Sequence, residues 1–435
     1  MNKSAFDKVI GYDAIKKELM QVCDMIRNRE RYEKLGAHLP KGILLYGDPG
    51  VGKTLLAKCF IEACGVKAFT LRRSRGGDGF VDEIAETFRK AKAEAPSVVF
   101  LDDMDKFANE DEHHRDAEEY VGVQAGIDEV RDADVLVLAT VNDVRKLPFS
   151  LRRSGRFDRR IEVGTPSAAD AARIVAYYLS DKKLASDVDM EDLTKMISYN
   201  SCAELETILN EAAVRSAFAG KECIAMDDLI EAVLRMQYDT ATDEDDDDDD
   251  ALHAGGDAAD DRFSTALHEA GHVTVSEALM PGSVGFAAIR RLGNGYAGYT
   301  HRCIGVANRR ISVLISLAGK AAVELYYADA CASGCQRDIA NAAHDVFEGM
   351  LHNGTRGFAA VDVSSYNTSE EMIRHVETIA QAELERCMFA VRKILLENRA
   401  FLEAAAALLA EKKTLRCSDV RALREKYGVT TAAAA

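Results

Sequence analysis

The residues from Gly47 to Thr54 constrain this chain more than any other stretch. They read Gly-Asp-Pro-Gly-Val-Gly-Lys-Thr and match the pattern G-x-x-x-x-G-K-[ST] at every position. The apolar run 42–46 before them predicts a short buried strand, and the residues from Leu55 onward predict a helix. Glycines in such a loop let backbone N–H groups approach phosphate oxygens, and the helix N-terminus adds a partial positive charge. The stretch therefore predicts a phosphate-binding loop in an α/β domain. The alternative is a glycine-rich turn without a ligand.

Each part of this loop has an expected role in binding a nucleoside triphosphate. The Lys53 ammonium group would reach the β- and γ-phosphates, and the Thr54 hydroxyl would bind Mg²⁺. The residues expected to bind the nucleotide are Gly47, Asp48, Pro49, Gly50, Val51, Gly52, Lys53 and Thr54.

Two further apolar runs end in polar residues. Residues 98–101 lead into Asp102 and Asp103, and residues 135–139 lead toward Asn142. Strands that alternate with helices imply a parallel sheet, with ligands at the carboxyl ends of the strands. We expect Asp102 to hold Mg²⁺ through water and Asp103 to orient the attacking water. Asn142 suits a polar sensor of the γ-phosphate.

The rest of the chain changes character along its length. Residues 13–35 follow the pattern of an amphipathic helix that Gly36 would end, and residues 168–238 read as entirely helical. The stretch 240–261 contains eleven acidic residues and no lysine or arginine. We interpret it as a self-repelling, solvated linker rather than a metal site. From Arg262 onward the pattern is again mainly helical.

Composition limits the class of protein. The net charge is −17, but it is −6 when the acidic stretch 240–261 is left out, so a nucleic-acid partner gains no support. Ten cysteines without a paired spacing indicate a reducing compartment. The sequence has no apolar run of about 18 residues and no signal peptide. We therefore expect a soluble, cytoplasmic protein with no membrane segment in this chain.

A second motif indicates metal chemistry. Residues 268–272 read His-Glu-Ala-Gly-His, which matches H-E-x-x-H inside a helical pattern. The i, i+4 spacing places His268 and His272 on one helix face, where both imidazoles can bind Zn²⁺, with Glu269 beside them as general base. The alternative is a pair of surface histidines. A catalytic zinc needs a third protein ligand and an open position. Asp338 is the candidate for this third ligand.

A basic segment brings the first family resemblance. Residues 151–159 carry four arginines in nine positions, which by themselves could form a salt-bridged surface. The phosphate loop, Asp102, Asn142 and the sequence Ser-Gly-Arg-Phe-Asp-Arg together resemble the AAA ATPases. In that family the arginines that match Arg153 and Arg156 reach the nucleotide of the next subunit. The resemblance implies ATP as the nucleotide, a homo-oligomeric ring that is usually hexameric, and arginines that act in trans.

The order of the motifs brings a second resemblance. An AAA domain, a lid, His-Glu-Ala-Gly-His and a distant aspartate, Asp338, resemble the FtsH-type ATP-dependent zinc proteases from about Ala5 to about Tyr427. The resemblance implies Asp338 as the third zinc ligand and polypeptides as substrates. The predicted domains are an α/β AAA ATPase large domain over 1–166, a helical lid over 167–239, the acidic linker over 240–261, a mainly α-helical zinc peptidase domain over 262–428, and a tail over 429–435.

Three features depart from the FtsH pattern. The family normally carries membrane helices before the ATPase domain, whereas this chain starts directly at that domain. We therefore expect a soluble relative. Asp103 stands where the family has glutamate, and its shorter side chain would slow hydrolysis unless the loop compensates. The pore-loop stretch 72–81 lacks the usual aromatic–apolar–Gly pattern. Phe80 and Val81 either grip the substrate there, or Phe80 is simply the first core residue of the next helix.

Taken together, these patterns predict an ATP-dependent zinc endopeptidase, in which an AAA ring unfolds cytosolic polypeptides and degrades them with the cofactors ATP, Mg²⁺ and Zn²⁺. Residues 295–300 could form an edge strand to which an extended substrate adds by backbone hydrogen bonds. One alternative is a non-proteolytic remodelling ATPase whose metal site is structural. The other is a regulatory ring in which Asp103 makes ATP a slow switch.

Overall fold

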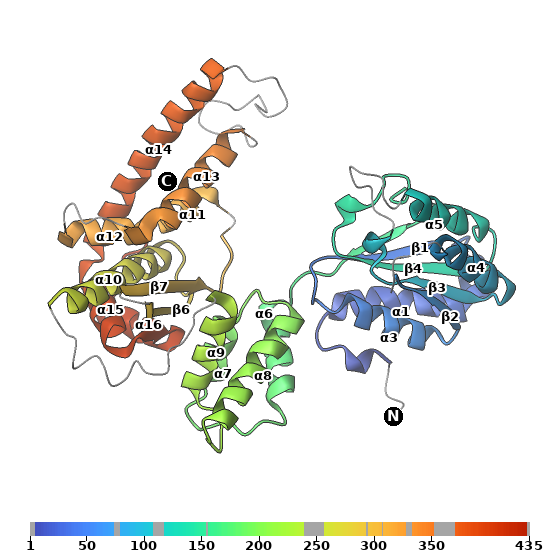
Figure 1. Cartoon of the computed structure of the whole chain (residues 1–435), viewed down its shortest axis with the longest axis horizontal. Helices are drawn as coiled ribbons and strands as arrows, with labels where there is room; N and C mark the ends of the chain where they lie inside the picture. Colours follow the sequence, from blue (N-terminus) through green and yellow to red (C-terminus); the bar gives the residue numbers. More distant parts are fainter. Residues whose placement is uncertain are drawn as a thin grey trace. The chain divides into compact units, whose positions relative to one another are not determined.

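The computed structural model describes residues 5–73, 79–107, 117–153, 155–238, 256–292, 295–306, 308–327, 333–351 and 370–432. Internal contacts divide the chain into two compact units (Figure 1). The first comprises Met1–Lys183 and Tyr199–Val214, and the second comprises Leu184–Ser198 and Arg215–Ala435.

A parallel sheet of five strands forms the centre of the first unit, in the order β2-β3-β4-β1-β5. The strands are β1 (Gly42–Tyr46), β2 (Lys67–Leu71), β3 (Ser97–Leu101), β4 (Val135–Val141) and β5 (Arg159–Glu162). Every residue of β3 and β4 is buried, as expected where helices cover both faces of a parallel sheet. This sheet confirms the predicted α/β class of the ATPase domain.

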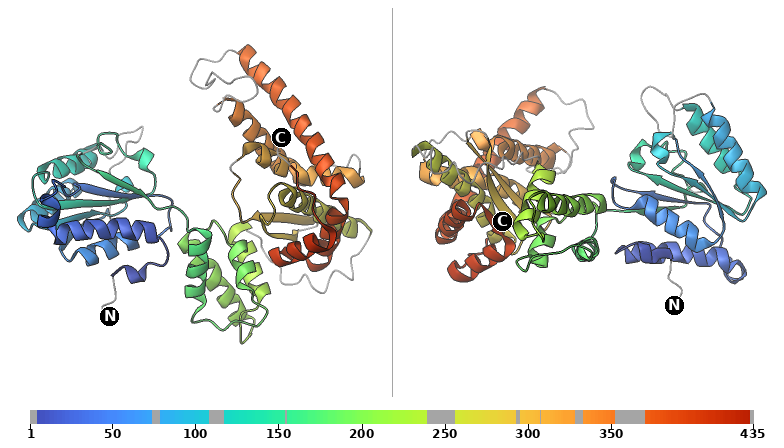
Figure 2. Two further views of the ribbon diagram at one scale, coloured as in Figure 1. Left: turned by 180° about the vertical axis from the view of Figure 1, so that it is seen from behind. Right: turned by 60° about the horizontal axis from the view of Figure 1, so that its bottom comes forward.

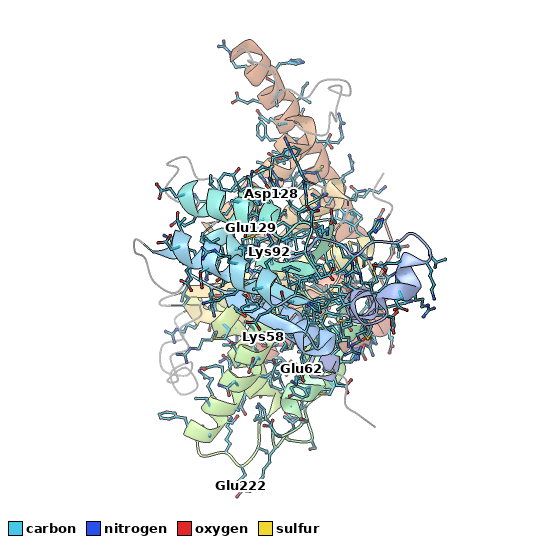
Figure 3. The ribbon with its side chains drawn as sticks, turned by 90° about the vertical axis from the view of Figure 1, so that its right-hand side faces the viewer. Lys58, Glu62, Lys92, Asp128, Glu129 and Glu222 are labelled. Atoms are coloured by element: carbon cyan, nitrogen blue, oxygen red, sulfur yellow. The ribbon has the colours of Figure 1, made fainter. Side chains whose placement is uncertain are left out.

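Helices lie on both faces of this sheet, as Figure 2 shows from two further sides. Successive side chains of a strand point to opposite faces. Ile43 and Leu45 of β1 therefore share a core with α1 (Asp13–Arg27) and α3 (Lys53–Cys64), whereas Leu44 shares a core with α4 (Phe80–Ala93) and α5 (Ala117–Glu129). An ion pair of 3.9 Å between Lys92 and Glu129 also joins α4 to α5 (Figure 3). Two further helices of this unit are α2 (Arg29–Glu33) and α6 (Ala168–Leu179).

The structure corrects the prediction of one helix over 13–35. Helix α1 ends at Arg27 and the short helix α2 begins at Arg29. Between them, Asn28 leaves the helical region with φ −116° and ψ 39°, and its side-chain amide nitrogen donates a hydrogen bond of 2.6 Å to Oδ1 of Asp24. Asparagine is among the residues of lower helix propensity, which fits a break at this position.

Phe80 packs as a core residue. Its side chain is 8% exposed, and its ring meets that of Phe107 edge to face with a centroid distance of 5.2 Å. Ile84 and Phe88, one and two turns along α4, belong to the same core. Of the two interpretations of Phe80, the structure favours the core residue over the substrate grip. Residues 74–78 of the same stretch lie outside the described residues.

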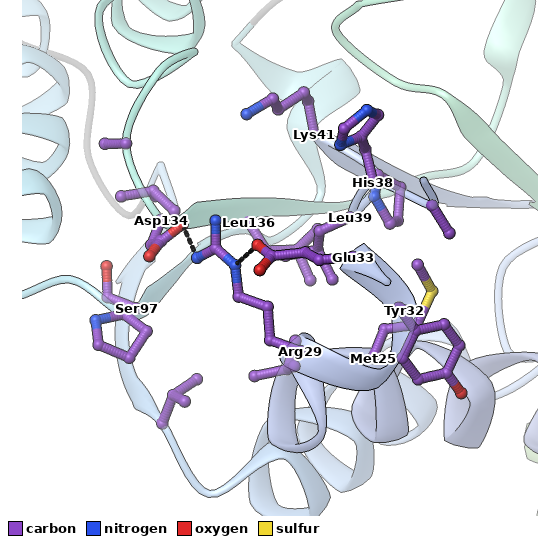
Figure 4. A pocket seen from close by; sticks show the side chains of 17 residues that line it. Met25, Arg29, Tyr32, Glu33, His38, Leu39, Lys41, Ser97, Asp134 and Leu136 are labelled. Atoms are coloured by element: carbon purple, nitrogen blue, oxygen red, sulfur yellow. Dashed lines mark hydrogen bonds and ion pairs between the residues drawn. The ribbon is translucent and has the colours of Figure 1, made fainter. Parts of the chain in front are cut away.

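A cavity of about 380 Å³ lies at the amino ends of β1, β3 and β4, whereas the phosphate loop follows the carboxyl end of β1. Arg29 is paired there with Glu33, at 2.6 Å, and with Asp134 (Figure 4). Hydrogen bonds to Asp134 and Glu33 raise the pKa of this guanidinium group. Apolar side chains of Met25, Ile26, Leu39, Val66, Pro96 and Leu136 also line the cavity.

An antiparallel sheet with the order β7-β6-β8 lies in the second unit. Its strands are β6 (Val284–Leu292), β7 (Gly295–Arg302) and β8 (Thr414–Arg416). Strand β7 is terminal in this sheet, which confirms the predicted edge strand over 295–300. The remaining helices are α7 (Met190–Met196), α8 (Cys202–Phe218), α9 (Met226–Tyr238), α10 (Gly256–Leu279), α11 (Arg309–Ser316), α12 (Ala318–Tyr327), α13 (Gln336–Leu351), α14 (Glu370–Glu397), α15 (Arg399–Lys412) and α16 (Cys417–Tyr427).

Helix α10 carries the His-Glu-Ala-Gly-His sequence through the middle of the second unit (Figure 1). It contacts α12, α15 and both long strands of the sheet. A Cβ atom on Gly271 would lie 2.6 Å from the carbonyl oxygen of Ala318, so this close approach of α10 to α12 requires glycine. The helix begins at Gly256, inside the stretch 240–261 that was predicted as a linker. Residues 239–255 lie outside the described residues.

Among the helices that the structure describes, none is both long enough and apolar enough to cross a lipid bilayer.

Candidate functional site

The phosphate loop 47–54 connects the end of β1 to the start of α3. Gly47, Gly50 and Gly52 have φ angles of 144°, 81° and 95°, in the region that side chains with a Cβ atom rarely adopt. Space is also limited, because a Cβ atom on Gly47 would lie 2.1 Å from the carbonyl oxygen of Val163. These glycines therefore give the loop a backbone path that other residues would strain.

The ammonium group of Lys53 lies inside this loop. It donates hydrogen bonds of 2.7 Å to the carbonyl oxygens of Gly47 and Asp48, and one of 2.9 Å to Oδ1 of Asn142. Burial lowers the pKa of Lys53, while carboxylates led by that of Asp105 act in the opposite direction. The structure thus brings Asn142, from the end of β4, to the phosphate loop.

Hydroxyl groups converge on Asp102. The Thr54 and Thr140 hydroxyls each donate a hydrogen bond of 2.9 Å to Oδ1 of Asp102. A carboxylate beside the Thr54 hydroxyl is the oxygen-rich environment that Mg²⁺ prefers. Sequence reasoning missed Thr140, although it is the polar residue in the otherwise apolar strand 135–141.

Asp103 follows Asp102 in the left-handed region, with φ 54°. Its backbone N–H donates to the Thr140 hydroxyl at 2.9 Å. Its carboxylate pairs with the Lys106 ammonium group at 2.7 Å and with the Arg72 guanidinium group at 3.5 Å. Asp103 is therefore held at the carboxyl edge of the sheet, with two cations on its side chain.

The arginines between β4 and β5 contact side chains outside the phosphate loop. Arg156 is paired with Asp128 of α5 at 2.7 Å, and this pairing lowers the pKa of Asp128. Asp128 is labelled in Figure 3. Arg153 is exposed, with its guanidinium group 5.2 Å from the centre of the Phe149 ring. In the described part of the chain, the contacts of these arginines do not include residues 47–54. The structure therefore does not bring them to the phosphate loop of their own subunit.

Three predicted metal ligands meet in the second unit. Nε2 of His268 lies 3.0 Å from Oδ2 of Asp338, and Nε2 of His272 lies 3.2 Å from the same oxygen. The two imidazole nitrogens are 3.1 Å apart. Asp338 comes from the first turn of α13, and both histidines come from α10. The fold thus brings an aspartate 70 residues away in the sequence to the pair of histidines.

The spacing of these three atoms fits a zinc ion. Zinc takes nitrogen and oxygen ligands at about 2.0–2.2 Å in a tetrahedral arrangement, which separates neighbouring ligand atoms by roughly 3.3 Å. The observed separations are 3.0, 3.1 and 3.2 Å. Two imidazoles and one carboxylate are also a donor set of catalytic zinc sites, where the fourth position stays open.

The far sides of both imidazole rings have partners of their own. Nδ1 of His272 lies 2.8 Å from the carbonyl oxygen of Ile315, which can only accept a hydrogen bond. This contact keeps the proton on Nδ1 and turns Nε2 toward the ligand position. Nδ1 of His268 lies 3.6 Å from the Cys335 sulfur. Burial lowers the pKa of His272, but the hydrogen bond to Asp338 and the charge of Glu269 raise it overall.

Glu269 is buried beside the metal ligands, with 5% of its surface exposed. Its Oε1 lies 3.9 Å from Nε2 of His268, and its Oε2 accepts a hydrogen bond of 2.6 Å from the Thr300 hydroxyl. Glycines make room for this arrangement. A Cβ atom on Gly298 would lie 2.3 Å from Oε1 of Glu269, and one on Gly319 would lie 2.3 Å from Nε2 of His268. Sequence reasoning missed these three neighbours, although the edge-strand pattern contains Gly298 and Thr300.

Comparison with known proteins finds relatives of this chain. Residues 43–165 match the model of the ATPase family associated with various cellular activities (AAA). The protein named ATP-dependent zinc metalloprotease FtsH from Streptobacillus moniliformis is 30% identical over 448 residues, which cover 96% of this chain and 64% of that relative. ATP-dependent zinc metalloprotease FtsH 2 from Symbiobacterium thermophilum is 30% identical, with 96% of this chain and 74% of the relative covered.

These matches extend over almost the whole chain. For Thermus thermophilus FtsH the identity is 29%, with 97% of this chain and 71% of the relative covered. The chain spans 64% and 56% of the length of the FtsH proteins from Streptobacillus moniliformis and Leptotrichia buccalis. With an AAA domain and 30% identity to relatives of which it covers about three quarters, this chain belongs to the FtsH family.

Proposed function

We propose that this protein is an ATP-dependent zinc endopeptidase that unfolds cytosolic polypeptides and cleaves them. The observation that carries the proposal is the meeting of His268, His272 and Asp338 beside the buried carboxylate of Glu269. The family membership and the phosphate loop support the dependence on ATP. The described cysteines are all free thiols, which suits a reducing compartment such as the cytosol.

Peptide hydrolysis needs an activated water and a group that takes its proton. A zinc ion held by His268, His272 and Asp338 would supply Lewis acidity and lower the pKa of a water molecule. Glu269 takes the proton at Oε1, since Thr300 already occupies Oε2. The same carboxyl group then gives the proton to the leaving amine, as a general acid. In this mechanism the two oxygens of Glu269 have different roles, because Oε1 carries the proton and Oε2 is held by Thr300.

The substrate binds along strand β7 in this account. This strand is terminal in its sheet, so an extended polypeptide can add to it through backbone hydrogen bonds. Such bonds do not depend on the side chains of the substrate. The same strand carries Thr300, which brings the bound polypeptide close to Glu269. This mode of binding suits a protease that accepts many unfolded sequences.

ATP binding and hydrolysis would use the first unit. Thr54 and Asp102 hold Mg²⁺, Lys53 and Asn142 reach the γ-phosphate, and Asp103 orients the attacking water. Nζ of Lys53 lies 2.9 Å from Oδ1 of Asn142, so both side chains can contact the same phosphate group.

The ring would be a hexamer in which Arg153 and Arg156 serve the nucleotide of a neighbouring subunit. Neither arginine contacts the phosphate loop of its own subunit in the described part of the chain, which suits a role in trans. A guanidinium group supplied by a neighbour stabilises charge that develops on the transferred phosphoryl group. Hydrolysis would therefore depend on assembly.

One observation favours the slower ATP switch as a second candidate function. The Asp103 carboxylate, already shorter than glutamate, is paired with Lys106 and Arg72. These contacts hold it away from a water molecule unless they break during the cycle. In this second candidate, ATP is bound for long periods and regulates the ring instead of powering rapid unfolding.

The experiment that tests the proposal is degradation of fluorescently labelled casein by the whole 435-residue chain. Complete reactions contain ATP, Mg²⁺ and Zn²⁺, and each is omitted in turn. We expect cleavage only in the complete reaction, with ATP turnover that continues when zinc is removed. Turnover of ATP without any cleavage would instead support the remodelling ATPase. Tight ATP binding with neither turnover nor cleavage would support the slow switch.

A further inference from the structure

Strand β7 presents two different faces to its surroundings. Side chains alternate along a strand, so Gly298 and Thr300 lie on one face while Tyr299 and His301 lie on the other. Helix α10 contacts this strand, and so does helix α7 of the predicted lid. The strand therefore lies between the helix with the metal motif and helices that precede the acidic stretch.

The face toward α10 fixes the carboxylate of Glu269. The Thr300 hydroxyl donates its 2.6 Å hydrogen bond to Oε2, which leaves Oε1 as the oxygen nearest to His268. Gly298 lies against the same carboxylate, because a Cβ atom there would be 2.3 Å from Oε1 and 2.5 Å from Cγ. One face of β7 thus sets both the rotation and the position of the general base.

The opposite face packs against the predicted lid. Nε2 of His301 lies 3.0 Å from the hydroxyl oxygen of Ser198, which follows α7 by two residues. The ring of Tyr299 lies 4.8 Å from that of Tyr238, the last residue of α9. The ring of Phe286 of β6 contacts both groups, because it stacks on His301 at a centroid distance of 5.7 Å and meets Tyr238 edge to face at 6.2 Å. Ser198, just after α7, and Tyr238 of α9 therefore contact the two side chains next to Thr300 in the sequence.

We propose that Thr300 is a positioning residue for Glu269, and that the lid, through Ser198, holds the strand on which Thr300 stands. This inference rests on the proposed peptidase function, and the contacts that carry it all lie within the second unit. A small displacement of β7 moves the Thr300 hydroxyl, and the carboxylate of Glu269 moves with it. Misplacement of a catalytic group by about 1 Å can cost on the order of a hundredfold in rate.

The first test replaces the hydroxyl of Thr300 in the full-length protein and measures cleavage of a short fluorogenic peptide. Thr300→Val should lower kcat by about tenfold or more, as loss of a hydrogen bond to a charged group predicts, with KM and zinc content unchanged. Thr300→Ser keeps the hydroxyl and should restore kcat to within about twofold. The control is Thr274→Val, which removes a buried hydroxyl of α10 that donates to the carbonyl oxygen of Ala270. The control should match wild type.

The second test asks whether the lid acts through Thr300. Ser198→Ala should lower kcat for the same peptide by a few-fold, as expected for one neutral hydrogen bond. In the Thr300→Val background the same change should have almost no further effect, because the link to Glu269 is already broken. Ser180→Ala, at the end of α6, removes an exposed hydroxyl that donates to Tyr177 and serves as the matched control.

Hydrogen exchange of the zinc-free protein gives a measurement that does not depend on catalysis. Ser198→Ala and Thr300→Val should each raise deuterium uptake of residues 295–302, whereas Thr274→Val and Ser180→Ala should not. If Ser198→Ala and Thr300→Val both took up deuterium at the wild-type rate over residues 295–302, the lid contact would not restrain β7.

The outcomes separate this inference from the proposed function. If wild-type protein cleaves the peptide but Thr300→Val keeps the wild-type kcat, or Thr300→Ser is as slow as Thr300→Val, the positioning role is wrong and the peptidase function stands. If Ser198→Ala has equal effects in both backgrounds, the lid does not act through Thr300. If wild-type protein with bound zinc cleaves nothing, the proposed function fails and this inference fails with it.

Discussion

The guanidinium group of Arg156 makes two hydrogen bonds to the carboxylate of Asp128, at 2.7 and 3.2 Å. A third reaches the carbonyl oxygen of Ser150, and the Arg156 side chain is only 14% exposed. Arg156 is therefore oriented by its own subunit. A pre-oriented guanidinium group suits a residue that must meet the nucleotide of a neighbour in a fixed geometry.

The first prediction concerns Arg156. Arg156→Ala should bind ATP almost normally but lose on the order of a thousandfold in ATP turnover, as loss of a trans arginine does in related systems. Asp128→Asn is the matched comparison, because it keeps the guanidinium group and weakens only its orientation, so its turnover should fall less than that of Arg156→Ala. Wild-type turnover in Arg156→Ala, or full turnover by a monomer in light scattering, would rule out the role in trans.

The second prediction concerns Asp103 and its partner Lys106. Asp103→Asn should lower ATP turnover by about a hundredfold or more at unchanged ATP affinity, because the group that orients and deprotonates water is lost. Lys106→Met should raise turnover, because it frees the carboxylate. The increase should stay within about fivefold, since the lysine is 56% exposed and such pairs contribute about 1 kcal/mol or less.

Lys90→Met is the control for Lys106→Met, because Lys90 is similarly exposed and pairs with Glu86 on the surface of α4. Steady-state ATPase rates of the three variants decide the matter. Unchanged turnover in Asp103→Asn would remove Asp103 from the chemistry.

The third prediction concerns metal content. His268→Ala and Asp338→Asn should each lose most of the bound zinc, because a catalytic site has only three protein ligands. His344→Ala should keep about one zinc per chain, since this histidine is exposed on the same helix as Asp338. Elemental analysis of the purified proteins after dialysis gives the answer. Full zinc content in Asp338→Asn would show that the third ligand lies elsewhere.

The fourth prediction is a pH dependence of stability. Burial, and then the nearby charge of Arg302, lowers the pKa of His301 from 6.5 to about 4. Between these values the unfolded chain binds a proton that the folded chain does not, so the free energy of unfolding should fall as the pH is lowered from 6.5 to about 4. Chemical denaturation across this range measures the slope. His301→Gln should flatten it, whereas His344→Gln should not, and equal slopes would contradict the assignment.

Much of the ATPase fold followed from local patterns. The apolar runs 42–46, 98–101 and 135–139 became the central strands β1, β3 and β4, because fully buried parallel strands must be apolar on both faces. Their carboxyl ends place the phosphate loop, Asp102 and Asn142 together. The break at Asn28 escaped prediction because a single asparagine of low helix propensity is a weak signal within a stretch of good helix formers.

The metal site shows where sequence reasoning ends. The pair of histidines follows from helical spacing alone, since positions i and i+4 share a face. Asp338 required a family resemblance, because no local rule brings α13 to α10. The contacts of Thr300 with Glu269 and of Gly319 with His268 were not predicted, although Thr300 belongs to the predicted edge strand. Their roles depend on distances across elements that are remote in sequence, and a hydroxyl or a glycine carries no local signal of its partner.

The most direct test of the account is a comparison of Glu269→Gln with wild-type protein, with unfolded casein as substrate and ATP and Zn²⁺ present. Peptide products are detected by mass spectrometry, and zinc content and ATP turnover are measured on the same samples. We expect Glu269→Gln to keep its zinc and its ATP turnover and to form no new peptides, because the proton acceptor for water is lost. Casein cleavage at the wild-type rate by Glu269→Gln would contradict the role of Glu269 as general base.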